Sequence, residues 1–130
     1  MLILVDTSIW VDYFRGGLNS NDLDFLIDEN LIVTNDIILT ELIPFLKVKK
    51  KIKVIQLLNS ILKFPLQIDW EEIIQYQIKC LKSGINGIGI PDLIIAQNLK
   101  QNNCYIYSFD KHFKRLQEII GIKVYEEEMG

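Results

Sequence analysis

Four acidic residues of this 130-residue chain have positions that ordinary structural roles explain only one at a time. Asp6 follows the apolar run LILV and Asp110 follows CYIYSF, so each comes directly after a candidate buried strand. Glu41 and Asp92 are the lone charges in the apolar stretches IILTELIPFL and GIGIPDLIIAQ. Any one of these carboxylates could cap a helix, favour a helix N-terminus or form a structural ion pair. Four in one chain also suggest a metal site.

A cluster of four carboxylates would require a cation. Ionised carboxylates at close range repel one another, and some stay protonated unless a positive charge compensates. Mg²⁺ and Mn²⁺ bind carboxylate oxygens, and Mg²⁺ in particular keeps several water molecules. Such a site suits phosphodiester cleavage, in which the metal ion generates hydroxide and neutralises charge on the phosphate. The four acids therefore predict a hydrolytic metal site, provided that the fold brings them together.

The elements that must position these acids alternate between strands and helices. Short apolar runs predict strands at 2–5, 31–34, 66–68, 104–109 and 122–125. Helical spacing and capping residues predict helices at 8–16, 21–29, 37–48, 51–64, 70–83, 93–102 and 111–120. This alternation predicts an α/β fold with a central parallel sheet covered on both faces. Ligands bind such sheets beyond the carboxyl ends of the strands, where Asp6 and Asp110 would lie.

Composition narrows the class of protein. Apolar residues make up 49% of the chain and charged residues 24%, which is typical of one globular domain spanning residues 1–130. No segment is apolar for long enough to cross a bilayer, and the run before Asp6 is too short for a signal peptide, so we expect a cytoplasmic protein. Cys80 and Cys104 lack metal-binding spacing and His112 is the sole histidine, so a Cys/His zinc site is not expected.

The net charge of −3 does not by itself indicate a nucleic-acid binder. Five lysines nevertheless gather in KVKKKIK, residues 47–53, where they could contact RNA phosphates or form a solvated helix face. Trp10, Tyr13 and Phe14 are expected to pack in the core, although a dimer face or a base-stacking surface remains open for them. Pro44 is expected to kink or interrupt its helix.

The chain resembles the PIN-domain ribonucleases, and among them the VapC toxins of bacterial and archaeal toxin–antitoxin pairs. The resemblance rests on the motifs VDTSIWVDYFRG, TEL, IPDLIIAQ and YSFDKHF and covers essentially the whole chain. It implies a three-layer α/β/α fold with a central parallel sheet, and a homodimer. It also implies a cognate antitoxin, which inserts a C-terminal segment into the active-site groove and binds operator DNA through its N-terminal part.

The resemblance also implies roles for individual residues. Asp6 and Asp92 would be the main ligands of Mg²⁺ or Mn²⁺, and Glu41 and Asp110 would complete the cluster directly or through water. Ser8 would form a hydrogen bond in the site and orient Asp6 or a water on the metal.

Two positions depart from the family's pattern. Pro44 follows the TELI segment and could shift the geometry around Glu41, and Lys and His follow Asp110 where a second acid often stands. His112 thereby becomes a neighbour of the site, and we expect a solvated side chain there rather than a ligand.

The resulting hypothesis is a metal-dependent endoribonuclease that cleaves RNA and acts as a toxin. Two alternatives remain: a housekeeping RNA-processing nuclease of the same fold, and a catalytically inactive module that binds RNA or protein. Phosphotransfer by a receiver-like or haloacid-dehalogenase-like domain is disfavoured. Ser8 stands where a dehalogenase has its second acid, and Asp6 lacks the adjacent acid of a receiver.

Overall fold

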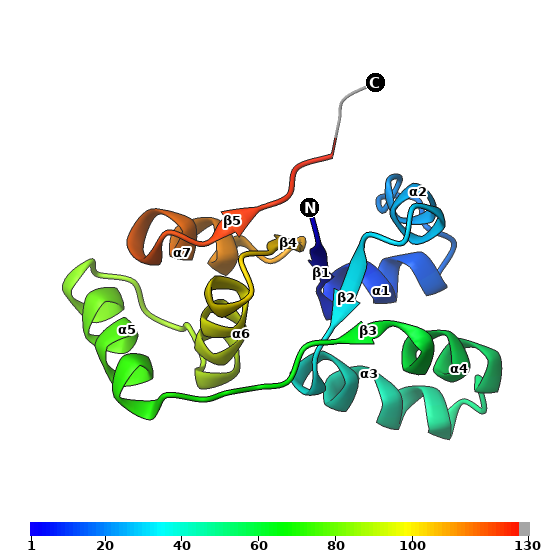
Figure 1. Cartoon of the computed structure of the whole chain (residues 1–130), viewed down its shortest axis with the longest axis horizontal. Helices are drawn as coiled ribbons and strands as arrows, with labels where there is room; N and C mark the ends of the chain where they lie inside the picture. The colour runs from blue at the N-terminus through cyan, green and yellow to red at the C-terminus, as the bar shows by residue number, and fades with distance from the viewer. Residues whose placement is uncertain (128–130) are drawn as a thin grey trace.

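The computed structural model describes residues 1–127, which fold around a five-stranded sheet. All four strand pairings are parallel, and the strand order is β3-β2-β1-β4-β5 (Figure 1). The strands are β1 (Ile3–Val5), β2 (Ile32–Thr34), β3 (Leu62–Lys63), β4 (Tyr105–Tyr107) and β5 (Lys123–Val124). The central strand β1 pairs with both β2 and β4. The predicted parallel sheet is therefore confirmed.

Within residues 1–127 the sheet is covered by helices that form two groups. The first comprises α1 (Thr7–Phe14), α2 (Leu23–Asp28), α3 (Asp36–Val48) and α4 (Ile52–Ser60). The second comprises α5 (Trp70–Lys82), α6 (Ile90–Gln101) and α7 (Lys111–Ile120). Helix α3 packs on α1 and α4, whereas α5, α6 and α7 pack on one another. Crossovers between parallel strands are almost always right-handed, so the reversal of direction after β3 places the two groups on opposite faces.

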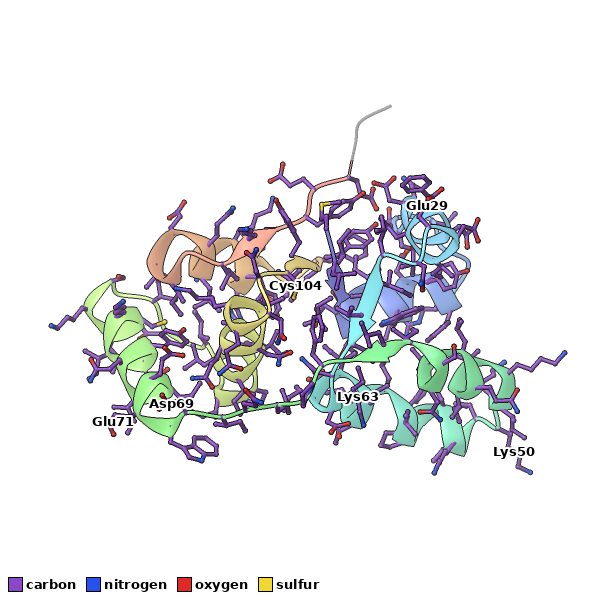
Figure 2. The ribbon with its side chains drawn as sticks, in the orientation of Figure 1. Glu29, Lys50, Lys63, Asp69, Glu71 and Cys104 are labelled. Carbon is purple, nitrogen blue, oxygen red and sulfur yellow. The ribbon has the colours of Figure 1, made fainter. Side chains whose placement is uncertain are left out.

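The core lies on both sides of the sheet. The three residues of β1 are fully buried, and Val33 of β2 and Ile106 of β4 are buried beside them. A strand with both faces covered is apolar at every position rather than at every second one, which explains the run LILV. Figure 2 shows Cys104 inside the molecule, whereas exposed side chains such as Lys50 lie at its margin.

The aromatic residues of α1 pack as expected. Trp10 is fully buried, and its ring stacks on Phe14 with the centroids 5.6 Å apart. Tyr13 and Phe14 are partly buried and pack against the core. Within the described part of the chain, no helix is both long and apolar enough to span a bilayer.

Helix α6 runs through the second layer as its most buried helix and is fixed by two buried amides. Asn98 accepts a hydrogen bond from Asn35 Nδ2 at 3.0 Å and donates one to the Pro65 carbonyl at 3.1 Å. Gln97 bonds both the N–H and the carbonyl of Asp69. These bonds hold the extended segment 64–69, which crosses from the α3–α4 side of the molecule to α5 (Figure 1).

Around this crossing one predicted helix is present but ends earlier than predicted, and one predicted strand is wrong. The helix predicted at 51–64 ends at Ser60, and Leu62–Lys63 pair with Val33 and Thr34 as the edge strand β3. Apolar spacing continues past Ser60 in the sequence, but the free edge of β2 decides the local structure. The segment 66–68 is not a strand; Leu66 and Ile68 instead pack their side chains against the core without sheet hydrogen bonds.

Pro44 does not interrupt α3, which continues through it to Val48. Proline has no N–H to donate to the carbonyl four residues earlier, which here belongs to Thr40. Both Pro44 and Thr40 are exposed, so water can reach this face of the helix and take the place of the missing bond.

Candidate active site

The four acids gather at the carboxyl edge of the sheet. Asp6 directly follows β1, and its backbone N–H donates to the Tyr107 carbonyl at 2.9 Å, which joins the ends of β1 and β4. Asp110 follows β4 and begins α7. The sheet changes its direction of winding between β1 and β4. Ligands of parallel α/β folds bind at such a switch point, because the crossovers diverge there and leave a crevice.

Asp6 is held by serine hydroxyls. It stands at the N-cap position of α1, yet its side chain makes no capping hydrogen bond. Its carboxylate, in a residue only 8% exposed, instead accepts hydrogen bonds at Oδ2 from Ser8 Oγ at 2.8 Å and from Ser108 Oγ at 2.6 Å. The capping interpretation of Asp6 is therefore wrong. Both serines use the same oxygen, which fixes the carboxylate and leaves Oδ1 to other partners.

The two serines also tie the loop after β4 to Asp6. Ser8 Oγ accepts the backbone N–H of Phe109 at 3.0 Å, and Ser108 Oγ accepts that of Asp110 at 2.9 Å. The two hydroxyls lie 3.3 Å apart. Each hydroxyl thus accepts from the loop and donates to Asp6, so the position of one acid is coupled to that of another.

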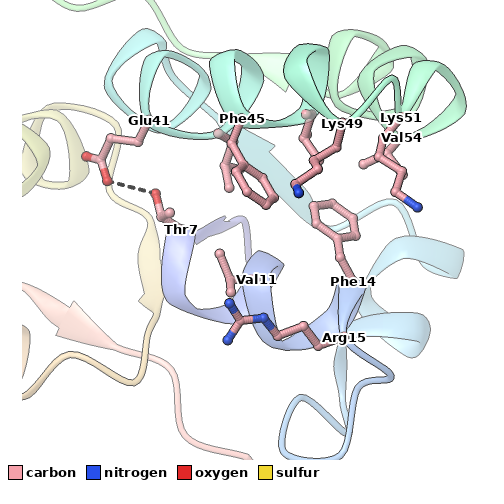
Figure 3. Close-up of a pocket in the computed structure, with 11 residues that line it drawn as sticks. Thr7, Val11, Phe14, Arg15, Glu41, Phe45, Lys49, Lys51 and Val54 are labelled. Atoms are coloured by element: carbon pink, nitrogen blue, oxygen red, sulfur yellow. Dashed lines mark hydrogen bonds between the residues drawn. The ribbon is translucent and has the colours of Figure 1, made fainter.

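Glu41 reaches the site from α3. Its Oε2 accepts a hydrogen bond from Thr7 Oγ1 at 3.0 Å (Figure 3). Burial raises the pKa of Glu41, the Thr7 hydrogen bond lowers it, and the charges of Asp6 and Asp92 raise it further. Two of the other three acids therefore lie close enough to raise the pKa of Glu41.

Asp92 and Asp110 form the centre of the cluster, and His112 joins them. His112 Nδ1 lies 3.4 Å from Asp92 Oδ2 and 3.5 Å from Asp110 Oδ1. One ligand atom from each of the three residues lies within 4.8 Å of the others. Burial raises the pKa of Asp92, the charge of Asp110 raises it next, and His112 partly offsets the rise. This repulsion is what a divalent cation would relieve.

Asp110 combines a capping role with its place in the cluster. Its Oδ1 accepts the backbone N–H of His112 at 2.9 Å, so the capping alternative for this residue is correct. Asp92 lies in the first turn of α6, where the helix dipole favours a negative charge. For both residues the structural role and a metal-binding role are compatible.

Two neighbours of the acids, Ser108 and Thr7, were not expected from the sequence, and neither was the orientation of His112. His112 does not extend into solvent, because its ring folds back onto Asp92 and Asp110 and is 32% exposed. Ser108 and Thr7 were not predicted to be hydrogen-bond partners of the acids, because serine and threonine are common beside strands and helix starts. One signal was available: Ser108 and Asp110 repeat the spacing of Asp6 and Ser8 in reverse order.

The donor set fits a hard divalent cation. Carboxylate oxygens from α6 and from the start of α7 come together, and Asp6 lies close enough to raise the pKa values of both Asp92 and Glu41. Among residues 1–127, a group of three potential ligands within 4.8 Å occurs here, at the edge where parallel sheets bind ligands. Carboxylate-rich sites suit Mg²⁺ and Mn²⁺.

An apolar groove leads away from Glu41 between α1 and the α3–α4 pair (Figure 3). Its volume is about 560 Å³. Phe45 lines its middle, and Phe14, Lys49 and Lys51 lie toward the end away from Glu41. The groove therefore joins the acidic cluster to part of the lysine-rich segment 47–53.

Fold and site together define an α/β protein with a carboxylate cluster at the switch point of a parallel sheet. The model of the PIN domain family matches residues 3–119. The chain therefore belongs to the PIN domain family, which confirms the resemblance seen in the sequence motifs. A comparison with curated proteins finds no match.

Solved structures with the same fold cover nearly the whole chain. VapBC2 from Rickettsia felis, bound to a DNA fragment from its promoter, aligns with a TM-score of 0.76 and 21% identity over 98% of this chain and 100% of that chain. FitAcB from Neisseria gonorrhoeae has a TM-score of 0.72 and 20% identity, covering 96% and 97% of the two chains. DNA-bound VapBC from Salmonella typhimurium has a TM-score of 0.72 and 17% identity, covering 96% and 98%. At these identities the similarity establishes the fold.

Proposed function

We propose that this protein is a metal-dependent endoribonuclease and the toxin of a toxin–antitoxin pair. The observation that carries the proposal is the convergence of Asp6, Glu41, Asp92 and Asp110 at the switch point of a PIN domain. The toxin assignment is supported by two VapBC structures in which the aligned chain shares the fold along nearly its full length.

The four acids would have different roles in hydrolysis. Asp92 and Asp110, with Asp6, would hold Mg²⁺ or Mn²⁺. Such an ion supplies hydroxide at neutral pH and neutralises charge on the scissile phosphate. Ser8 and Ser108 keep Asp6 in one orientation, so that it need not reorganise during the reaction. Glu41, with its raised pKa, is suited to accept a proton from an attacking water.

The groove beside Glu41 would bind both the antitoxin and the RNA substrate. Its apolar middle suits the C-terminal segment of an antitoxin, which would thereby cover the route to the acids. Lys49 and Lys51 at the far end could meet the phosphates of an RNA in the absence of that segment. One surface would then bind substrate and inhibitor in turn.

A homodimer is supported by an exposed apolar face on α5. Trp70, Ile74, Ile78 and Leu81 recur at helical spacing and are 59%, 51%, 37% and 61% exposed. The first turn of α5 is acidic and its last turn is basic. Two copies of α5 packed antiparallel would bury this face and place the acidic turn of each copy beside the basic turn of the other.

RNA cleavage by purified, antitoxin-free protein tests the proposal. Total cellular RNA is incubated with the protein in Mg²⁺ or Mn²⁺, with EDTA and Asp6→Asn as controls. We expect discrete fragments that disappear in both controls. A folded protein that binds metal and cuts no RNA, and whose induction does not arrest growth of the host, would instead support an inactive binding module. Cleavage without growth arrest would support housekeeping RNA processing.

A further inference from the structure

His112 has a side chain whose ring nitrogen lies against the acidic cluster. The residue is in the first turn of α7, where its backbone N–H is bonded to Asp110 Oδ1. Its ring turns back so that Nδ1 faces carboxylate oxygens of Asp92 and Asp110. Nδ1 itself is buried, although the side chain is 32% exposed, and among residues 1–127 it has no hydrogen-bond partner.

The distances from Nδ1 differ from those of a hydrogen bond. Charge-assisted N–H···O bonds are about 2.7–2.9 Å long, whereas Nδ1 lies 3.4 and 3.5 Å from the two oxygens. Adjacent ligand atoms around a cation with bonds of about 2.1 Å are separated by roughly 3.0–3.4 Å. Nδ1 therefore lies about as far from each of the two oxygens as one ligand of an ion lies from the next, and one ligand atom from each of the three residues lies within 4.8 Å of the others.

We infer that His112 Nδ1 is a metal ligand alongside Asp92 and Asp110, and that it makes the site prefer a first-row transition-metal ion such as Mn²⁺ to Mg²⁺. This inference rests on the proposed function, because it assumes that the cluster holds a divalent ion. His112 would then be a metal ligand rather than the solvated side chain expected from the sequence.

The preference follows from the chemistry of the nitrogen donor. Mg²⁺ demands oxygen ligands and gives up water reluctantly, so an imidazole in place of a carboxylate or water weakens its binding. First-row transition metals accept imidazole nitrogen, and affinity of nitrogen-containing sites rises along the series from Mn²⁺. An acid in place of His112 would restore an all-oxygen site.

The sole histidine of the chain allows a direct spectroscopic test. Protein purified without a polyhistidine tag is loaded with Mn²⁺, and pulsed electron paramagnetic resonance is used to detect coupling to an imidazole ¹⁴N. We expect this coupling in the wild type and its loss in His112→Ala. Absence of the coupling in the Mn²⁺-loaded wild type would overturn the inference, because His112 would then be only a neighbour of the carboxylates.

Calorimetry with Mn²⁺ and Mg²⁺ tests the preference. We expect His112→Ala to lose at least about 10-fold in Mn²⁺ affinity, since even residues that only orient a ligand contribute 10–100-fold. We expect His112→Asp to narrow the ratio of Mn²⁺ to Mg²⁺ affinity. Unchanged affinities in both variants would contradict the inference.

A third variant separates this inference from the proposed function. Asp92→Asn should abolish binding of both ions if the cluster is a metal site. Loss of binding in Asp92→Asn with none in His112→Ala would reject the role of His112 alone. Retention of binding in Asp92→Asn would reject the metal site on which the proposed function depends.

Discussion

The Ser108 hydroxyl donates a 2.6 Å hydrogen bond to Asp6 Oδ2. The same oxygen of Ser108 accepts the backbone N–H of Asp110 at 2.9 Å. One hydroxyl group thus connects the acid that follows β1 with the acid that follows β4. The two acids lie on either side of the switch point of the sheet, where diverging crossovers leave a crevice. This bond therefore holds the two acids in a fixed relative position across that crevice.

Removal of this hydroxyl should affect both stability and cleavage. Ser108→Ala leaves Asp6 with one serine partner and the Asp110 N–H without its acceptor. We expect a loss of about 2 kcal/mol in the free energy of unfolding, because a bond to a charged group contributes more than a neutral one. Urea denaturation measures this loss, and RNA cleavage should fall in parallel.

Ser83→Ala is the matched control, since Ser83 is exposed at the end of α5, outside the site. Equal stability of Ser108→Ala and Ser83→Ala would show that the hydroxyl network contributes little.

The metal-free protein should become more stable when the Asp92 charge is removed. Burial and the charge of Asp110 raise the pKa of Asp92 above its ordinary value of 3.8. Between the raised pKa and 3.8 the folded state binds more protons than the unfolded state, so the free energy of unfolding increases as pH falls through this window. Above the window, the ionised carboxylate destabilises the folded protein.

Denaturation in EDTA at a series of pH values measures this effect. At pH 7 we expect Asp92→Asn to exceed the wild type in stability by ~1 kcal/mol, within the range of substitutions that relieve unfavourable charges. The difference should shrink as the pH approaches 4, and the exposed Glu118→Gln should show no such trend. A wild type that is more stable than Asp92→Asn at pH 7 without metal would contradict the electrostatic description of the cluster.

The buried amide pair should support the fold rather than the chemistry. Asn98→Ala deprives Asn35 Nδ2 and the Pro65 carbonyl of their partners. An unsatisfied buried polar group costs about 1–3 kcal/mol, so we expect a loss of at least ~2 kcal/mol in the free energy of unfolding. Asn59→Ala, at an exposed residue of α4, is the control. A folded Asn98→Ala protein should bind metal like the wild type, and weaker binding would show that the pair also positions the site.

The apolar face of α5 should control the oligomeric state. Ile74→Asp places a charge in the middle of this face, and a buried unpaired charge is strongly unfavourable. We expect a dimeric wild type and a monomeric variant in sedimentation experiments, with unchanged helix content. Phe25→Asp, at an exposed apolar residue on α2, should remain dimeric. If Ile74→Asp is also dimeric, the interface lies elsewhere.

The sequence was sufficient to predict the strands whose residues are almost all apolar. All of β1 and most of β4 are buried, and strands with both faces covered leave a nearly unbroken apolar pattern. Asp6 was recognisable because a charge directly after a buried strand is conspicuous, and Asp110 because it follows the apolar run by only a few residues. The edge strand β3 was missed because its two residues are exposed and its structure depends on pairing with β2.

The environment of His112 could not be predicted from spacing. Asp92 and His112 lie 20 positions apart and begin different helices, so their contact depends on how α6 packs against α7. No periodicity along the chain reports the angle between two helices. The same holds for the Ser108–Asp6 bond, which joins residues 102 positions apart.

Cleavage of RNA by the wild type and by four single variants tests the central claim most directly. Asp6→Asn, Glu41→Gln, Asp92→Asn and Asp110→Asn each remove one charge of the cluster and keep its shape. We expect metal-dependent fragments from the wild type and a loss of at least ~100-fold in the cleavage rate for Asp92→Asn, because the loss of a metal ligand should exceed the ~10–100-fold effects of residues that only orient ligands. Wild-type cleavage rates in all four variants, or cleavage that survives EDTA, would show that the carboxylate cluster is not the catalytic centre.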